Sequence, residues 1–107
     1  MLQTLTTPRG ETLSGTPWQV YPRPQMRRDS YINLNGEWDF AVSSGKPETF
    51  DMRILVPFCP ESRLSGIGRH FEEGAPLWYR RRFLLPEGFR RERVLLHIGA
   101  ADQIAEV

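Results

Sequence analysis

The sequence predicts an all-β protein, built as a sandwich of antiparallel sheets. Glycine and proline, nine of each, are spread along the chain and favour many short elements over a few long helices. No window keeps apolar residues at the i, i+3, i+4, i+7 spacing of an amphipathic helix. Several short runs instead alternate apolar and polar side chains, which is typical of strands with one buried face.

The first strand is expected directly after the dipeptide Asn35-Gly36, because glycine supplies the positive φ of a turn without steric cost. A second strand is expected over residues 50–56 and should end at Pro57, which cannot donate to a sheet ladder. One face of the first strand is expected to carry Trp38, Phe40 and Val42, and the other Asp39 and Ala41.

A third strand is expected over residues 76–86, although three consecutive arginines stand in its middle. Because side chains alternate across a strand, the arginines do not form one patch. A further apolar strand is expected over residues 94–98, with Val94, Leu96 and Ile98 on one face. The third strand should have Tyr79, Arg81, Phe83 and Leu85 on one face, and Trp78, Arg80, Arg82 and Leu84 on the other.

The domain organisation is predicted as an irregular N-terminal arm over residues 1–17, followed by a partial β-sandwich domain over residues 18–107. The arm is rich in Thr, Ser, Gly and Pro and shows no apolar period. The chain ends at Val107 without a closing turn, so we expect the sandwich to be incomplete at its C-terminal end. The long irregular stretch over residues 59–76 is the kind of loop that is usually functional or mobile.

Composition argues against several classes of protein. The chain has 14 basic and 13 acidic residues, so its net charge of +1 is too small for a dedicated nucleic-acid binder. No basic start followed by an apolar run predicts a signal peptide, and no apolar stretch reaches the roughly 20 residues of a membrane helix. The single cysteine, Cys59, excludes an internal disulfide. We therefore expect a cytoplasmic protein without nucleic-acid or membrane partners.

The aromatic and arginine side chains each allow two interpretations. Trp18, Trp38 and Trp78 could stack on sugar rings or pack in the core, and for Trp38 the alternation favours the core. The arginines could contact phosphate, but an inward-pointing arginine more simply needs a carboxylate partner, because an unpaired charge is costly to bury.

The titratable side chains allow catalysis or metal binding beside ordinary structural positions. His70 and His97 are far apart, and no metal-ligand spacing links them to each other or to Cys59. Glu61 and the pair Glu72–Glu73 could act as general acid or base, but glutamates in a polar loop are usually solvated. We therefore expect no catalytic residue, no metal site and no cofactor in this chain.

Four blocks of sequence are familiar when taken in order: residues 21–40, 56–68, 78–86 and 93–107. They read YPRPQMRRDSYINLNGEWDF, VPFCPESRLSGIG, WYRRRFLLP and RVLLHIGAADQIAEV. Together they resemble the amino-terminal sugar-binding domain of glycoside hydrolase family two, which includes β-galactosidases, β-glucuronidases and β-mannosidases. The resemblance covers residues 18–107.

The resemblance implies a jelly-roll-like antiparallel β-sandwich, similar to galactose-binding domains. In the family, this domain is followed by an immunoglobulin-like sandwich and a (β/α)8 barrel that carries both catalytic glutamates of a retaining mechanism. It therefore implies a fragment of a glycoside hydrolase that is not an enzyme by itself and meets a β-linked glycoside through the barrel. A free-standing carbohydrate-binding module and a structural remnant without activity are the alternatives.

The resemblance also implies a substrate-side loop after the second strand. In β-galactosidases of the family, this loop sends an asparagine towards the sugar, and the aligned position here is about Cys59. Glu61 and Arg63 lie in the same loop as possible substitutes. The block WYRRRF is implied to be an interior strand, with Arg81 paired to an acidic side chain and Arg80 and Arg82 towards solvent or a neighbouring domain. Structural roles are expected for Trp38, Tyr79, Arg81 and Phe83.

Overall fold

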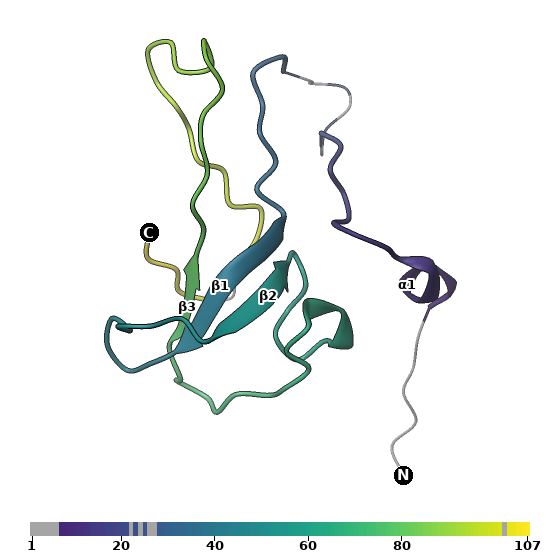
Figure 1. The fold of residues 1–107 in the computed structure, drawn as a ribbon, viewed down its shortest axis with the longest axis vertical. Helices are drawn as coiled ribbons and strands as arrows, with labels where there is room; N and C mark the ends of the chain where they lie inside the picture. The colour runs from purple at the N-terminus through teal and green to yellow at the C-terminus, as the bar shows by residue number, and fades with distance from the viewer. Residues whose placement is uncertain (1–6, 22, 24, 26–27, 102) are drawn as a thin grey trace.

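The computed structural model describes residues 7–21, 23, 25, 28–101 and 103–107. The all-β class is confirmed in this part of the chain, where three strands form one antiparallel sheet and helix is limited to short stretches (Figure 1). In chain order the elements are the helix α1 (Pro8–Thr12), the strands β1 (Gly36–Val42) and β2 (Met52–Val56), the 3-10 helix η2 (Arg63–Ser65) and the strand β3 (Leu77–Arg80).

The sheet has the order β2-β1-β3, so β1 is the central strand. The two strands predicted around Asn35-Gly36 and over residues 50–56 are confirmed as β1 and β2. β2 ends at Val56, directly before Pro57, as the missing N–H of proline requires. The register aligns Trp38 with Ile54 in β2 and Phe40 with Tyr79 in β3.

One face of the sheet carries only apolar and aromatic side chains. The residues of this face are identified from the register, because residues that lie opposite each other share a face. At its centre Phe40 and Ile54 are fully buried, with 0% and 1% of their surface exposed. The rings of Tyr79 and Phe71 lie 5.2 and 5.7 Å from the Phe40 ring, centroid to centroid, and close the core around it. This face is formed by Trp38, Phe40, Val42, Met52, Ile54, Val56, Leu77 and Tyr79.

The opposite face of the sheet carries the charged side chains of the strands, together with Ala41, Leu55 and Trp78. It carries an ion pair between Asp39 and Arg80, with an N–O distance of 2.9 Å, and a longer one between Glu37 and Arg53 at 3.4 Å. The Arg80 guanidinium also lies 4.2 Å from the centroid of the Phe50 ring, where a cation–π interaction stabilises its charge.

Burial along β1 departs from strict alternation at its C-terminal end. Ala41 belongs to the face with the charged side chains yet is buried, whereas Val42 on the apolar face is exposed. The register aligns Ala41 with Trp78, and the Trp78 indole N–H donates to the Ser43 carbonyl oxygen at 2.8 Å. The large indole therefore lies beside Ala41, which accounts for its burial.

Two strand predictions in the C-terminal third are wrong. β3 ends at Arg80, short of the predicted Pro86, and it is an edge strand in this sheet where an interior strand was expected. Residues 94–98 form no strand. Alternation indicates which side chains could share a face, but a strand also needs a neighbouring strand to bond its backbone groups. In β3, residues pair with β1 only as far as Arg80.

The described part of the N-terminal arm contains one helical turn, α1, which the sequence analysis did not expect. Its start follows common capping chemistry: the Thr7 hydroxyl accepts a hydrogen bond from the Gly10 N–H at 3.0 Å, and Pro8 occupies the first helical position. Residues 1–6 of the predicted arm lie outside the described residues.

The chain exposes far more surface than its mass requires. Its accessible area is 10061 Å², whereas a folded monomer of 12.4 kDa exposes about 6,100 Å². Much of this area follows β3, where the chain leaves the sheet, turns around Pro86 and Phe89 and returns (Figure 1). Exposed large apolar side chains in this segment are Phe83, Leu84, Leu85, Val94, Leu95, Leu96, Ile98, Ile104 and Val107.

Candidate functional site

The loop after β2 is held by its own hydrogen bonds. The Ser62 hydroxyl donates to the Cys59 carbonyl oxygen at 2.8 Å and accepts from the Ser65 N–H at 3.2 Å, which caps η2. Ser65 is 1% exposed, and its hydroxyl donates to the Ser62 carbonyl at 2.7 Å and accepts from the Ile67 N–H at 3.1 Å. Gly66 ends the 3-10 helix with a left-handed φ of 84°. A loop built in this way presents its outward side chains in fixed positions.

This loop brings two of the predicted site residues close to β3. The pKa of Tyr79 is raised, mainly because the half-buried phenol is poorly solvated, and further by electrostatic interaction with Glu61 and Cys59. A tyrosine is already neutral at ordinary pH, and the raised pKa keeps the Tyr79 phenol neutral to higher pH. A neutral phenol both donates and accepts hydrogen bonds, and beside a carboxylate it can bind a hydroxyl-bearing ligand.

The other groups of this loop are more loosely arranged. The His70 Nδ1 lies 3.7 Å from the Glu61 carboxylate, and both side chains are largely exposed. Arg63 lies on η2, and its exposed side chain makes no hydrogen bond or ion pair with another described residue. Of the three predicted substrate-side residues, Cys59 and Glu61 thus act electrostatically on Tyr79, and Arg63 does not.

The predicted carboxylate partner of Arg81 is wrong. Its guanidinium Nη1 donates to two backbone carbonyl oxygens, those of Leu34 at 2.7 Å and Asn35 at 3.0 Å. Arg80 makes the ion pair instead, with two nitrogens donating to the Asp39 carboxylate. Neutral carbonyls can satisfy an arginine without a second charge, which the residue pattern alone does not reveal.

Arg81 lies close against the backbone at position 36, where glycine leaves room for its guanidinium. A Cβ at Gly36 would lie 2.7 Å from Nη1 of Arg81, closer than van der Waals contact allows. Gly36 also has a φ of 138°, a conformation that residues with a side chain rarely adopt. The start of β1 and the chain after β3 are therefore joined through the Arg81 guanidinium.

A polar cavity of about 690 Å³ lies where Arg81 meets the start of β1. The Asn33 amide nitrogen in its wall donates to the Trp18 carbonyl at 2.6 Å, and the Asn33 amide oxygen accepts from the Asn35 N–H at 2.8 Å. Amides and charged groups that surround one space suit a ligand with several hydroxyl groups. The wall is formed by Gly15, Thr16, Gln19, Asn33, Asn35, Gly36, Glu37, Leu55 and Arg81.

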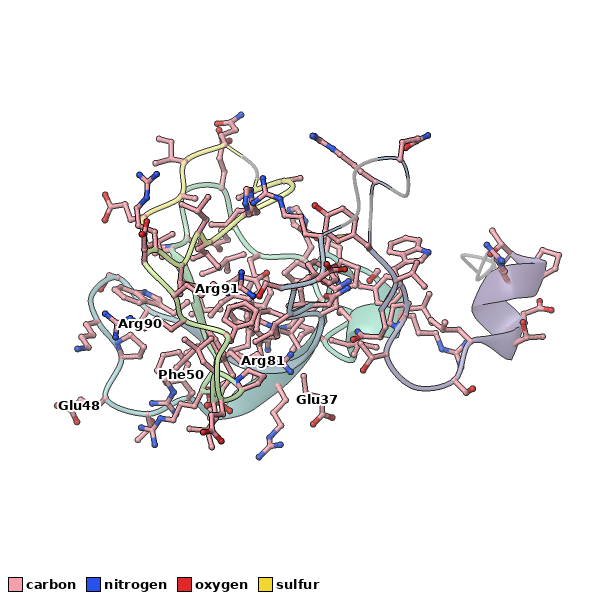
Figure 2. All side chains as sticks on the ribbon, turned by 90° about the horizontal axis from the view of Figure 1, so that it is seen from above. Glu37, Glu48, Phe50, Arg81, Arg90 and Arg91 are labelled. Atoms are coloured by element: carbon pink, nitrogen blue, oxygen red, sulfur yellow. The ribbon has the colours of Figure 1, made fainter. Side chains whose placement is uncertain are left out.

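A second, smaller cavity of about 340 Å³ adjoins the first through their shared residues Glu37 and Arg81. Figure 2 labels both side chains. Asp39, Arg80 and Arg82 complete its wall. Arg80 is neutralised by Asp39, whereas Arg82 has no hydrogen-bond or ion-pair partner among the described residues. The smaller cavity is therefore mainly charged.

Sequence reasoning missed most of the larger cavity. Only Arg81 of its wall was a predicted site residue, and the amides of Gln19, Asn33 and Asn35 were not considered as ligands. The polar run around Asn35 was interpreted as a turn before β1, although it was the one signal that could have indicated a binding site.

Structural roles were also predicted for Trp38 and Phe83. Trp38 is half-buried, and its indole N–H donates to the Leu34 carbonyl at 2.7 Å. Phe83 follows the end of β3 and is half exposed. Within the described residues, no group of three or more His, Cys, Asp or Glu side chains could hold a metal ion, and no helix is long and apolar enough to cross a membrane.

Comparison with known proteins adds no relative. No protein-family model matches the chain, and no curated protein matches its sequence. The resemblance to glycoside hydrolase family two therefore rests on the four sequence blocks alone.

Proposed function

We propose that this chain is the amino-terminal, non-catalytic sugar-binding domain of a retaining β-glycosidase, and that its sheet is part of a jelly-roll-like β-sandwich. The observation that carries the proposal is the order of the four family-two blocks along residues 21–107. The antiparallel sheet supports it, because the first and third blocks overlap β1 and β3.

The arrangement of the loop after β2 adds support. In the family this loop faces the sugar, and here it carries Glu61 and Cys59 beside the neutral phenol of Tyr79. A carboxylate accepts hydrogen bonds from sugar hydroxyls, and the phenol donates and accepts. These groups would form one wall of an active-site pocket, while the two carboxylates of retaining hydrolysis, about 5 to 5.5 Å apart, would belong to the catalytic barrel.

The reading frame beyond Val107 tests this proposal. We expect it to encode an immunoglobulin-like sandwich and a barrel with two catalytic glutamates. A stop codon with no barrel downstream would argue against the proposal. Hydrolysis of a β-glycoside by the purified 107-residue chain alone would also contradict it.

The role of the loop is tested in the protein encoded by that frame, with chromogenic β-galactosides and β-glucuronides as substrates. We expect Glu61→Gln to raise KM more than it lowers kcat, because Glu61 would contact the sugar without taking part in bond cleavage. Glu48→Gln changes an exposed glutamate in the connection between β1 and β2 and is the matched control. Equal kinetics of both variants and the unaltered protein would exclude Glu61 from the sugar site.

A free-standing carbohydrate-binding module is the second candidate, and the exposure of Trp18 favours it. Trp18 is 65% exposed, and its neighbours Thr16 and Gln19 line the larger cavity. An exposed indole beside amide groups can stack on a sugar ring while the amides bind its hydroxyls. Calorimetric titration of the chain with β-galactosides and β-glucuronides should then show binding that Trp18→Ala removes. A titration without heat would reject the module.

A further inference from the structure

The outer edge of β3 has unpaired backbone groups. The Ser43 N–H donates to the Pro76 carbonyl oxygen at 3.3 Å, one position beyond the pair Val42–Leu77. Ser43 and Pro76 therefore form a hydrogen-bonded pair. Hydrogen-bonded and non-hydrogen-bonded pairs alternate along an antiparallel ladder, so Trp78 and Arg80 also bond to β1, and Leu77 and Tyr79 do not. Leu77 and Tyr79 therefore direct their N–H and C=O groups away from the sheet, and no residue described in the structure bonds to them. Such an edge can accept another strand.

The surroundings of this edge are apolar and exposed. Leu77 and Tyr79 are 37% and 41% exposed, and Leu84 in the segment that follows is 93% exposed. The edge strand and the segment after it therefore offer exposed apolar side chains to a partner.

The charges on either side of β3 are opposite in sign. Glu72 and Glu73 precede the strand, and Arg81 and Arg82 follow it. When two copies of one strand pair antiparallel about a two-fold axis, the residues before the strand in one copy lie beside the residues after it in the other. The pairing therefore brings the acidic segment that ends at Glu73 in one copy towards Arg82 of the other, whereas a parallel pairing would bring like charges together.

We propose that two copies of this chain associate through the outer edges of their β3 strands, antiparallel and about a two-fold axis. The two three-stranded sheets then form one continuous sheet. Leu77 and Tyr79 supply the new backbone hydrogen bonds, and Glu73 of one copy lies near Arg82 of the other. This interface depends on the edge of β3 and not on sugar binding, so its failure would leave the proposed function unaffected.

Sedimentation equilibrium of the full chain over a wide concentration range tests the proposal. We expect a monomer–dimer equilibrium for the unaltered chain. Arg82→Glu and Glu73→Arg should each raise the dimer dissociation constant about tenfold or more, because each change acts twice in a symmetric dimer. The combined variant Arg82→Glu/Glu73→Arg should restore it. Glu48→Arg, in the connection between β1 and β2, makes the same change of charge elsewhere and should have no effect.

A proline variant tests the backbone edge itself. Leu77→Pro removes an N–H that β1 does not use, so circular dichroism should show an intact sheet while the protein becomes monomeric. A folded, unaltered chain that stays monomeric at every concentration would overturn the proposal. Association that persists unchanged in the charge-reversed variants would also overturn it, because contact between apolar surfaces would then suffice without the β3 edge.

Discussion

Replacement of Gly36 by alanine is a small change that should destabilise the protein strongly. The change adds only a methyl group, but its Cβ would lie 2.7 Å from the Arg81 guanidinium, so the guanidinium must move. The movement breaks one or both of its hydrogen bonds to the carbonyls of Leu34 and Asn35. The φ of 138° at this position is an additional cost for any residue with a side chain.

The magnitude follows from these two effects. A strained φ costs on the order of 1 to 3 kcal/mol. A hydrogen bond from a charged donor contributes about 1.5 to 3 kcal/mol when buried, and about 1 kcal/mol is a fair value for the half-buried Arg81. We therefore expect Gly36→Ala to lower the free energy of unfolding by about 3 kcal/mol, within a range of about 2 to 4.

Urea unfolding followed by circular dichroism at one protein concentration measures this loss. Gly45→Ala is the matched control, because a Cβ there meets no atom within 4 Å, and it should change stability by less than about 1 kcal/mol. In an Arg81→Ala background, Gly36→Ala should cost only the φ strain, so the two changes should be less than additive. Equal urea midpoints for Gly36→Ala and the unaltered protein would refute this account of Arg81 and the start of β1.

Three further predictions concern the sheet. Phe40→Ala should cost about 3 to 5 kcal/mol in urea unfolding, because Phe40 is fully buried, whereas Phe40→Leu should cost clearly less; equal losses would show that the cavity is not the cause. Arg80→Gln should cost less than about 1 kcal/mol by the same assay, because its pair with Asp39 is partly exposed; a larger loss would mean that the Phe50 contact dominates. Because the pKa of Tyr79 is raised in the folded protein, its contribution to stability should be fully present below the ordinary tyrosine pKa of about 10 and should be lost as the pH rises through the folded pKa. Urea unfolding at several pH values measures this decrease in the free energy of unfolding, and the decrease should be smaller in Tyr79→Phe.

The sequence predicted the strands whose limits are set locally. β1 begins at the Asn35-Gly36 dipeptide and alternates clearly. β2 ends before Pro57, because proline has no N–H to donate to the sheet. Residues 94–98 alternate equally well but form no strand, because pairing depends on a neighbour that the pattern does not specify.

The site was less predictable than the strands. The loop containing Cys59 and Glu61 was selected by resemblance, and its closeness to Tyr79 depends on how β2 and β3 are arranged around β1. The partner of Arg81 could not be inferred from residue types, because backbone carbonyls are present at every position. The wall of the larger cavity combines Gln19 and Asn33, which are separated in the sequence, and neither residue is unusual by itself.

The three tryptophans give the protein built-in fluorescent reporters with different surroundings. The indoles of Trp38 and Trp78 both donate to backbone carbonyls beside the sheet, whereas Trp18 is largely open to water. A soluble quencher such as iodide should therefore reach Trp18 first. The quenched fraction of the emission would report on the N-terminal region, and the protected fraction would report on the sheet.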